Sequence, residues 1–150
     1  MYGSVARITT SFIDVPGEIA VAIYLAGCSI HCPHCQNKEL WDRTSGIAMS
    51  VGTIVDCIKE HPLAESVVFL GGEPTDQIDF LQGICGAITN KKKVLYTGRE
   101  FEWLPSELTD NLDMIICGPY RKELHVNKWP ASSNQRVFIK DQKSWITQAT

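Results

Sequence analysis

Three cysteines lie close together directly after a long apolar run, and this arrangement constrains the fold more than any other feature of the chain. The run covers residues 19–26 and is typical of a strand buried on both faces, as strands of parallel sheets are. Cys28, Cys32 and Cys35 follow with the spacing C-x3-C-x2-C. A short loop with this spacing can wrap one face of an iron–sulfur cubane and leave one iron open to a ligand other than protein. The sequence therefore predicts a cluster-binding loop at the end of a buried strand.

Two other interpretations of the cysteine loop remain open. A structural zinc site could be completed by His31 or His34, although such sites prefer four fixed ligands in paired knuckles, and no second knuckle follows. The three cysteines could also be unrelated reduced thiols. The remaining cysteines, Cys57, Cys85 and Cys117, are predicted to be small buried apolar residues rather than ligands.

Composition and charge limit the classes of protein to consider. With 150 residues, of which 44% are hydrophobic, the chain can bury one sizeable core, so we expect residues 1–150 to form a single domain. A net charge of −3 gives no general attraction to nucleic acid, and no run of about 18 apolar residues could span a membrane. The first seven residues lack the features of a signal peptide. We therefore expect a cytoplasmic protein with reduced or metal-bound cysteines and without nucleic-acid or membrane partners.

Apolar runs alternate with helical periodicities along the chain. The pattern predicts strands at residues 4–10, 19–26, 66–70, 94–96, 112–116 and 135–139, helices from Ser50 to before Pro62 and over 76–89, a short helical segment at 101–104, and a polar tail from residue 140.

Residues that could bind a ligand or take part in a reaction directly follow four of these strands. Cys28, Gly71, Thr97 and Gly118 each come at or just after a predicted strand end. Because the carboxyl ends of parallel strands share one edge of a sheet, these positions should converge on one site. The right-handed crossover rule gives a parallel sheet, and few strands cannot close an eight-stranded barrel. The sequence predicts an α/β fold, namely an open partial (βα) barrel with a mostly parallel sheet of about four to six strands.

Two of the strand ends carry glycine motifs. In Gly71-Gly72-Glu73-Pro74, the glycines let the backbone approach a ligand, and Glu73 supplies an anionic acceptor suited to an amino group. Thr97-Gly98 offers a hydroxyl and an unobstructed backbone. Both pairs also occur in ordinary tight turns, which is the alternative interpretation.

The cysteine spacing resembles that of the radical S-adenosylmethionine (SAM) enzymes. Residues 12–17 (FIDVPG) and 37–40 (NKEL) look like the N-terminal portion of activating enzymes for anaerobic ribonucleotide reductase and other glycyl radical enzymes. Residues 129–137 (WPASSNQRV) are similar to the C-terminal Gly-Ser-x-Asn-Gln pattern of the reductase activases, with Ala131 in place of the glycine. Cys117 is a departure, because the family usually has Asp-Gly-Pro-Phe where this chain has Cys-Gly-Pro-Tyr.

The resemblance implies a [4Fe-4S] cluster whose unique iron chelates SAM through its amino and carboxylate groups. The implied ligands of iron are Cys28, Cys32 and Cys35. The implied SAM contacts are Gly71, Gly72 and Glu73 at the amino group and Thr97 and Gly98 at the ribose. His34, which adjoins Cys35, is expected near the adenine. His31 is expected to face solvent. No side chain need act as an acid, base or nucleophile, because the cofactors carry the chemistry.

The implied function is activation of a partner enzyme. A reduced cluster donates an electron to SAM, the carbon–sulfur bond breaks, and the 5′-deoxyadenosyl radical abstracts hydrogen from a glycine of the partner, with anaerobic ribonucleotide reductase as the implied partner and a protein such as a flavodoxin as electron donor. One alternative is a compact radical SAM enzyme acting on a small molecule such as a deazapurine precursor. The short chain favours a protein substrate, since few residues remain to enclose a small one. A non-enzymatic zinc-binding module is the more distant alternative.

Overall fold

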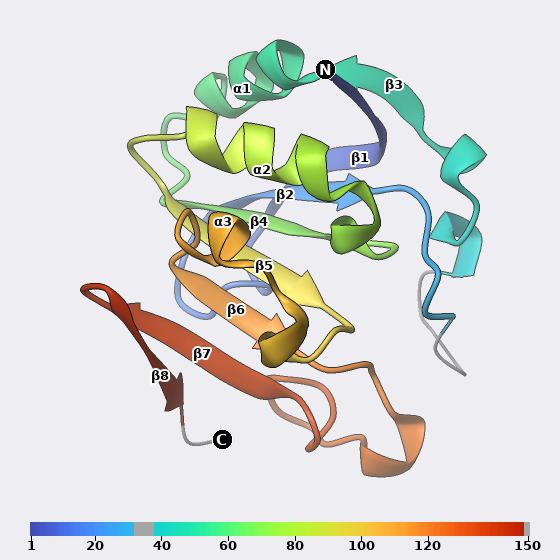
Figure 1. The fold of residues 1–150 in the computed structure, drawn as a ribbon, viewed down its shortest axis with the longest axis vertical. Coiled ribbons are helices and arrows are strands. Elements are labelled where there is room, and N and C mark those ends of the chain that lie inside the picture. The colour runs from blue at the N-terminus through green and yellow to red at the C-terminus, as the bar shows by residue number, and fades with distance from the viewer. Residues whose placement is uncertain (32–37, 149–150) are drawn as a thin grey trace.

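One eight-stranded sheet organises the computed structural model of this protein, which describes residues 1–31 and 38–148 (Figure 1). The strands are β1 (Tyr2–Ser11), β2 (Ala20–Leu25), β3 (Ile47–Ser50), β4 (Ser66–Gly71), β5 (Lys92–Thr97), β6 (Met114–Cys117), β7 (Arg136–Asp141) and β8 (Ser144–Gln148). The α-helices are α1 (Val51–Lys59), α2 (Ile78–Ala87) and α3 (Ser106–Thr109). The short 3-10 helices are η1 (Lys38–Leu40), η2 (Arg43–Ser45), η3 (Pro74–Gln77), η4 (Phe101–Trp103) and η5 (Lys122–Leu124).

The sheet is open and mixed, with the strand order β3-β1-β2-β4-β5-β6-β7-β8. Its centre matches the prediction, because β2, β4, β5 and β6 pair in parallel. The flanks do not, because β1, β3, β7 and β8 are joined to the sheet by antiparallel pairings. The expected mostly parallel sheet of four to six strands is therefore wrong in strand number and in the direction of its outer strands, and the pairing does not by itself define a barrel.

Two edge strands account for the difference in strand number. In β3, none of the residues is buried, and β8 is exposed at every position but one, so neither carries the buried alternation that marks a strand in the sequence. β8 replaces the polar tail expected from residue 140. It returns from β7 through a two-residue turn in which Gln142 has a φ of 58°, a conformation usually supplied by glycine or asparagine.

The α-helices pack on one face of the sheet and form the larger core with it. Its fully buried side chains include Ile54 of α1, Leu81 and Ile84 of α2, and Leu108 of α3, packed with Ile23, Phe69, Leu95 and Ile115 of the sheet. Ser50 caps α1 as expected, since its Oγ accepts a hydrogen bond from Thr53 N at 3.1 Å. The predicted helix over residues 76–89 is present as η3 followed by α2.

The opposite face of the sheet carries a smaller apolar cluster that contains no residue of the described α-helices. Its members are Val15, Ala20, Ala22, Val68, Val94, Met114, Ile116 and Val137, with Tyr24, Leu70, Tyr96 and Trp129 packed against it. Loops rather than helices therefore cover this helix-free face, which leaves space at the strand ends. Within residues 1–31 and 38–148, no helix has the length and apolar character needed to cross a bilayer.

Candidate functional site

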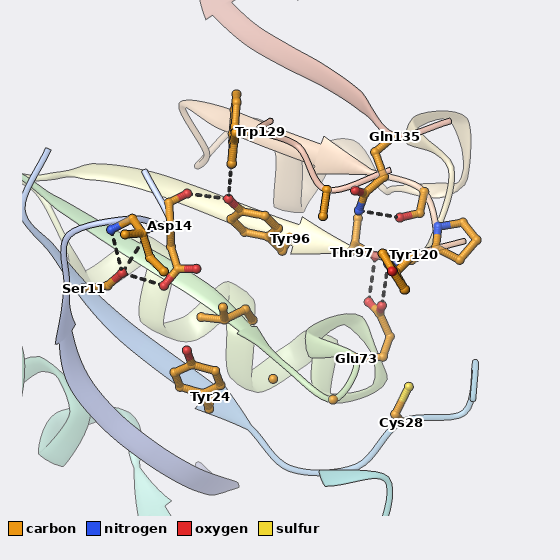
Figure 2. A pocket seen from close by; sticks show the side chains of 18 of the residues that line it. Ser11, Asp14, Tyr24, Cys28, Glu73, Tyr96, Thr97, Tyr120, Trp129 and Gln135 are labelled. Carbon is orange, nitrogen blue, oxygen red and sulfur yellow. Dashed lines mark hydrogen bonds between the residues drawn. The ribbon is translucent and has the colours of Figure 1, made fainter. Parts of the chain in front are cut away.

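A cleft of about 760 Å³ lies on the helix-free face at the carboxyl ends of the parallel strands (Figure 2). Its lining includes Cys28, Gly71, Gly72, Glu73, Thr97, Gly98 and Gly118. The structure therefore brings together Cys28, Gly71, Thr97 and Gly118, whose positions after predicted parallel strands led us to expect this convergence. Cys32, His34 and Cys35 lie outside the described residues, so their assignments stay predictions.

The loop that begins at Cys28 is closed at its base by the backbone. Gly27 N donates to Leu40 O at 2.7 Å, and Cys28 N donates to Trp41 O at 3.0 Å. Gly27 has a φ of 94°, which lets the chain turn sharply away from β2. His31 is exposed, as expected, and its ring stacks on Trp41 with centroids 4.2 Å apart. The entry and exit of the cysteine loop are thus held side by side.

The Cys28 thiol faces the cleft from a half-buried position (Figure 2). Burial raises the pKa of this thiol, and hydrogen bonds from the backbone of His31 and Ile30 act in the opposite direction. Amide donors directed at sulfur stabilise a thiolate, the form that binds metal. A cysteine sulfur in the lining of the cleft is the type of donor that iron–sulfur clusters take, so Cys28 fits such a ligand by residue type and position.

Gly71 and Gly72 pack against the end of β2 and the start of the cysteine loop. Gly71 has a φ of 125°, and a Cβ atom added there would lie 2.5 Å from Leu25 O. Gly72 N donates to Leu25 O at 3.0 Å, and Glu73 N donates to Gly27 O at 2.8 Å. The glycines are therefore required by packing within the protein, a role that sequence reasoning about ligand approach missed.

Glu73 is a buried carboxylate, 2% exposed, that joins the end of β4 to the end of β5. Its Oε2 accepts hydrogen bonds from Thr97 Oγ1 at 2.7 Å and from the amide and hydroxyl of Thr75 at 3.1 and 2.6 Å. Its Oε1 accepts from Gly98 N at 2.8 Å (Figure 2). The carboxylate therefore accepts four hydrogen bonds within the protein, three of them at Oε2, and these fix its orientation in the lining of the cleft.

Tyr96 anchors the far wall of the cleft and was not singled out from the sequence. Its hydroxyl donates to Asp14 O and accepts a hydrogen bond from Trp129 Nε1 at 2.6 Å (Figure 2). Burial raises the pKa of the Tyr96 hydroxyl far above its ordinary value. Strand alternation could have located it, because Leu95 packs in the helix-covered core and its neighbour must face the other side.

The segment that resembles the activase C-terminal pattern contacts the turn after β6. Asn134 Nδ2 donates to Pro119 O at 2.9 Å, and Gln135 Nε2 donates to Gly118 O at 3.3 Å. Both turn residues and Gln135 line the cleft. Sequence similarity pointed to this segment, but only the structure shows that it holds one rim of the cleft.

The cysteines outside the loop differ in their surroundings. Cys85 and Cys117 are fully buried, as expected, and burial raises the pKa of each thiol to about 12. Cys57 on α1 is half-buried, so the expectation of a buried position is not met there. Cys57 lies in a nine-residue surface helix, and a side chain at the edge of the apolar face of such a helix packs without being fully buried.

Fold and cleft together define an α/β protein with a thiol-bearing site at the ends of its parallel strands. The chain belongs to the family described as a 4Fe-4S single cluster domain, which matches residues 14–138. Family membership confirms the expected iron–sulfur cluster and disfavours the zinc-binding module.

The relatives agree with the resemblance seen in the sequence. The anaerobic ribonucleoside-triphosphate reductase-activating protein of Enterobacteria phage T4 is 27% identical over 144 residues, which cover 89% of this chain and 92% of that protein. A 7-carboxy-7-deazaguanine synthase of Synechocystis is 27% identical over 146 residues, covering 92% of this chain and 67% of the synthase. Among solved structures, QueE from Escherichia coli aligns with a TM-score of 0.56 and 19% identity over 65% of this chain and 52% of that chain, which shows a shared fold.

Proposed function

We propose that this protein is a radical SAM activase that generates a glycyl radical on a partner enzyme, and that the partner is an anaerobic ribonucleoside-triphosphate reductase. The observation that carries the proposal is the position of Cys28, whose thiol opens into the same cleft as the ends of β4 and β5. The phage T4 activating protein supports it, because the alignment extends over 92% of that protein.

The proposed site follows from the residues around the cleft. Cys28, Cys32 and Cys35 would hold the [4Fe-4S] cluster; Gly71, Gly72 and Glu73 would contact the amino group of SAM, Thr97 and Gly98 its ribose, and His34 its adenine. Glu73 is a carboxylate in the lining of the cleft, which supports the amino-group contact, since an ammonium group is bound by such acceptors. When bound, the cluster and SAM supply the one-electron chemistry that ends in hydrogen abstraction from glycine.

The chain's own residues serve to place the cofactors and limit the access of water. Glu73, Thr97 and Gly98 are already joined by hydrogen bonds, so their geometry does not depend on a ligand. Phe12 and Ile13 line the cleft and are 68% and 80% exposed. Exposed apolar side chains beside a site are typical of protein-binding surfaces, which supports a protein substrate.

The proposal extends to the organisation of the chain and its electron supply. A single sheet runs through the described residues from β1 to β8, which supports one radical-SAM domain over residues 1–150. An electron donor such as a flavodoxin follows from the resemblance alone, and a cytoplasmic location is proposed from the features of the sequence.

A second candidate is a radical SAM enzyme acting on a deazapurine precursor. The likeness to 7-carboxy-7-deazaguanine synthases in sequence and to QueE in fold supports it. The activase is favoured because the chain spans 92% of the phage activating protein and 67% of the Synechocystis synthase.

Electron paramagnetic resonance under anaerobic conditions tests the proposal. Protein reconstituted with iron and sulfide, reduced and loaded with SAM, is incubated with the reductase, and a glycyl doublet is expected in the reductase. The Cys28→Ala variant serves as the matched control and should give no doublet. SAM cleavage without a protein radical, together with turnover of a deazapurine precursor, would move the assignment to the second candidate.

A further inference from the structure

The residue that follows the first cluster cysteine is held by a carboxylate from a different part of the chain. Ser29 N donates to Asp76 Oδ2 at 2.7 Å, and Ser29 Oγ donates to Asp76 Oδ1 at 2.9 Å. Asp76 lies in η3, directly after the Gly71–Pro74 motif. One carboxylate therefore fixes both the backbone and the side chain of Ser29.

Arg99 joins the same pair from the end of β5. Its Nη2 donates to Asp76 Oδ1 and to Ser29 Oγ, each at 3.0 Å, and its Nε lies 3.5 Å from Thr75 Oγ1. The guanidinium carbon lies 4.7 Å from the centre of the Trp103 ring, which covers the other side of the group. The Arg99 side chain is thus held by contacts with several elements.

Shared hydrogen bonds separate these groups from an isolated surface ion pair, because Ser29 and Arg99 both donate to Asp76. The side chains of Arg99 and Asp76 are 27% and 24% exposed. Isolated pairs at the surface contribute little because water and salt screen them, whereas networks with charge-assisted hydrogen bonds hold a fixed geometry. The three residues come from β2's exit, η3 and the loop after β5, so they connect three strand ends.

We propose that Asp76 and Arg99 are positioning residues that hold the Cys28 loop in the orientation needed to bind the cluster. Asp76 acts directly on Ser29, and Arg99 acts by holding the Asp76 carboxylate and the Ser29 hydroxyl in place. The inference rests on the proposed function only for the identity of the group that Cys28 binds. The hydrogen bonds among Ser29, Asp76 and Arg99 are present whichever group Cys28 binds.

The network formed by Ser29, Asp76 and Arg99 is also continuous with the proposed SAM contacts. Arg99 N donates to Thr97 Oγ1 at 3.0 Å, and Thr97 Oγ1 donates to Glu73 Oε2 at 2.7 Å. A displacement of the cysteine loop would therefore be transmitted to Thr97 and Glu73. Loss of Asp76 should alter how SAM perturbs the cluster as well as how firmly iron is held.

The first test follows the release of iron to a ferrous chelator from reconstituted protein. Asp76→Asn keeps the side-chain shape, removes the charge and replaces one of the two acceptor oxygens by an NH2 group, and Asp76→Ala removes the contacts. Groups that orient metal ligands through hydrogen bonds change metal affinity by roughly 10- to 100-fold, so iron release from Asp76→Ala should be faster by a factor in that range. Asp79→Asn is the matched control, because Asp79 is an exposed residue of α2 outside this network.

A second measurement does not depend on the cluster. In metal-free protein, hydrogen exchange at the Ser29 amide should be slow in the wild type and in Asp79→Asn, and faster in Asp76→Ala. Ser29→Ala removes the hydroxyl but keeps the amide contact, so it should retain this protection. Combining Asp76→Asn with Arg99→Gln should give an effect on iron release that differs from the sum of the single effects, since groups in contact couple.

The outcomes separate the two proposals. If wild-type protein binds no [4Fe-4S] cluster, the proposed function fails, while altered Ser29 exchange in Asp76→Ala would still support the positioning role. If the wild type binds the cluster and both Asp76 variants match it in three measurements, the positioning role is overturned. These are iron release, the SAM-induced change in the electron paramagnetic resonance spectrum of the cluster, and hydrogen exchange at the Ser29 amide. Thermal melting of each variant identifies any that fail to fold.

Discussion

Gly72 packs so closely on the backbone of Gly27 that the end of β4 has no room for a Cβ atom there. A Cβ atom added to Gly72 would lie 2.7 Å from the carbonyl carbon of Gly27 and closer still to its oxygen. The glycine motif after β4 is therefore packed directly on the residue that precedes Cys28. A substitution at Gly72 is therefore expected to displace Gly27 and the start of the cysteine loop.

Gly72→Ala should destabilise the protein and weaken iron binding together. Overpacking against a backbone that cannot move aside costs about 1–3 kcal/mol in the free energy of unfolding. Urea unfolding and iron analysis of the reconstituted variant measure the two effects. Gly86→Ala is the control: an added Cβ has nothing within 4 Å, and the change should stabilise α2 by about 0.5–1 kcal/mol. Normal iron content in Gly72→Ala would contradict the coupling.

Replacement of Cys28, Cys32 or Cys35 by alanine should each abolish the bound cluster, because two thiolates cannot hold a cubane. Iron and sulfide content and the visible absorption of the reconstituted variants provide the measurement. Cys57→Ala and Cys85→Ala should keep normal iron content. Equal loss of iron from Cys85→Ala would refute the assignment.

Glu73→Gln should separate the ends of β4 and β5. The change leaves one weaker carbonyl acceptor and replaces the other carboxylate oxygen by an NH2 donor, which would face either Thr97 Oγ1 or Gly98 N in a site that is 2% exposed. Hydrogen bonds to charged groups contribute about 1.5–3 kcal/mol each, so a loss of that order in unfolding free energy is expected. SAM affinity, measured by calorimetry on cluster-loaded protein, should fall as well. Thr97→Val serves for comparison, because it removes one donor and keeps the carboxylate. If neither variant changes SAM affinity, Glu73 and Thr97 are excluded from the SAM site.

Alkaline pH should destabilise the protein through its buried thiols. The pKa of Cys85 and of Cys117 rises from the ordinary value of 9.0 to about 12 on burial. In the unfolded chain each thiol ionises near pH 9, whereas the folded protein keeps the proton, so the unfolding free energy contributed by burial is intact below pH 9 and falls as pH rises toward 12. The slope is at most about 1.4 kcal/mol per pH unit for each thiol. Urea unfolding from pH 8 to 11 should show a shallower decline in Cys85→Ala than in the wild type, and identical slopes would contradict the interpretation.

The parallel centre of the fold could be predicted because burial on both faces leaves a clear trace. β2 and β4 are nearly continuous apolar runs, and each ends in a motif that breaks the strand. β3 and β8 leave no such trace, since edge strands with exposed side chains are indistinguishable from loops by hydrophobicity. Their antiparallel direction depends on turns, and the turn at Gln142 lacks the residues that usually mark it.

For the site, the convergence of the strand ends could be predicted from the sequence, but the hydrogen bonds between the site residues could not. The expectation of parallel strands placed Cys28, Gly71, Thr97 and Gly118 at one edge of the sheet. The sequence contains no information that pairs Asp76 with Ser29 or Tyr96 with Asp14, because those contacts depend on the path of loops across the strand ends. Glycines at 71 and 72 were interpreted as room for a ligand, although the same residues are needed to let two backbones meet.

The placement of the α-helices on a single face of the sheet has a consequence for when chemistry can start. Under the proposed function, the cleft on the other face is open on one side, and the enzyme that carries the glycine covers that opening when it docks. A reaction chamber shared between two chains is sealed only while they are docked. Radical formation is then timed by encounter with the correct partner, and an undocked activase keeps its reactive centre facing water rather than a substrate.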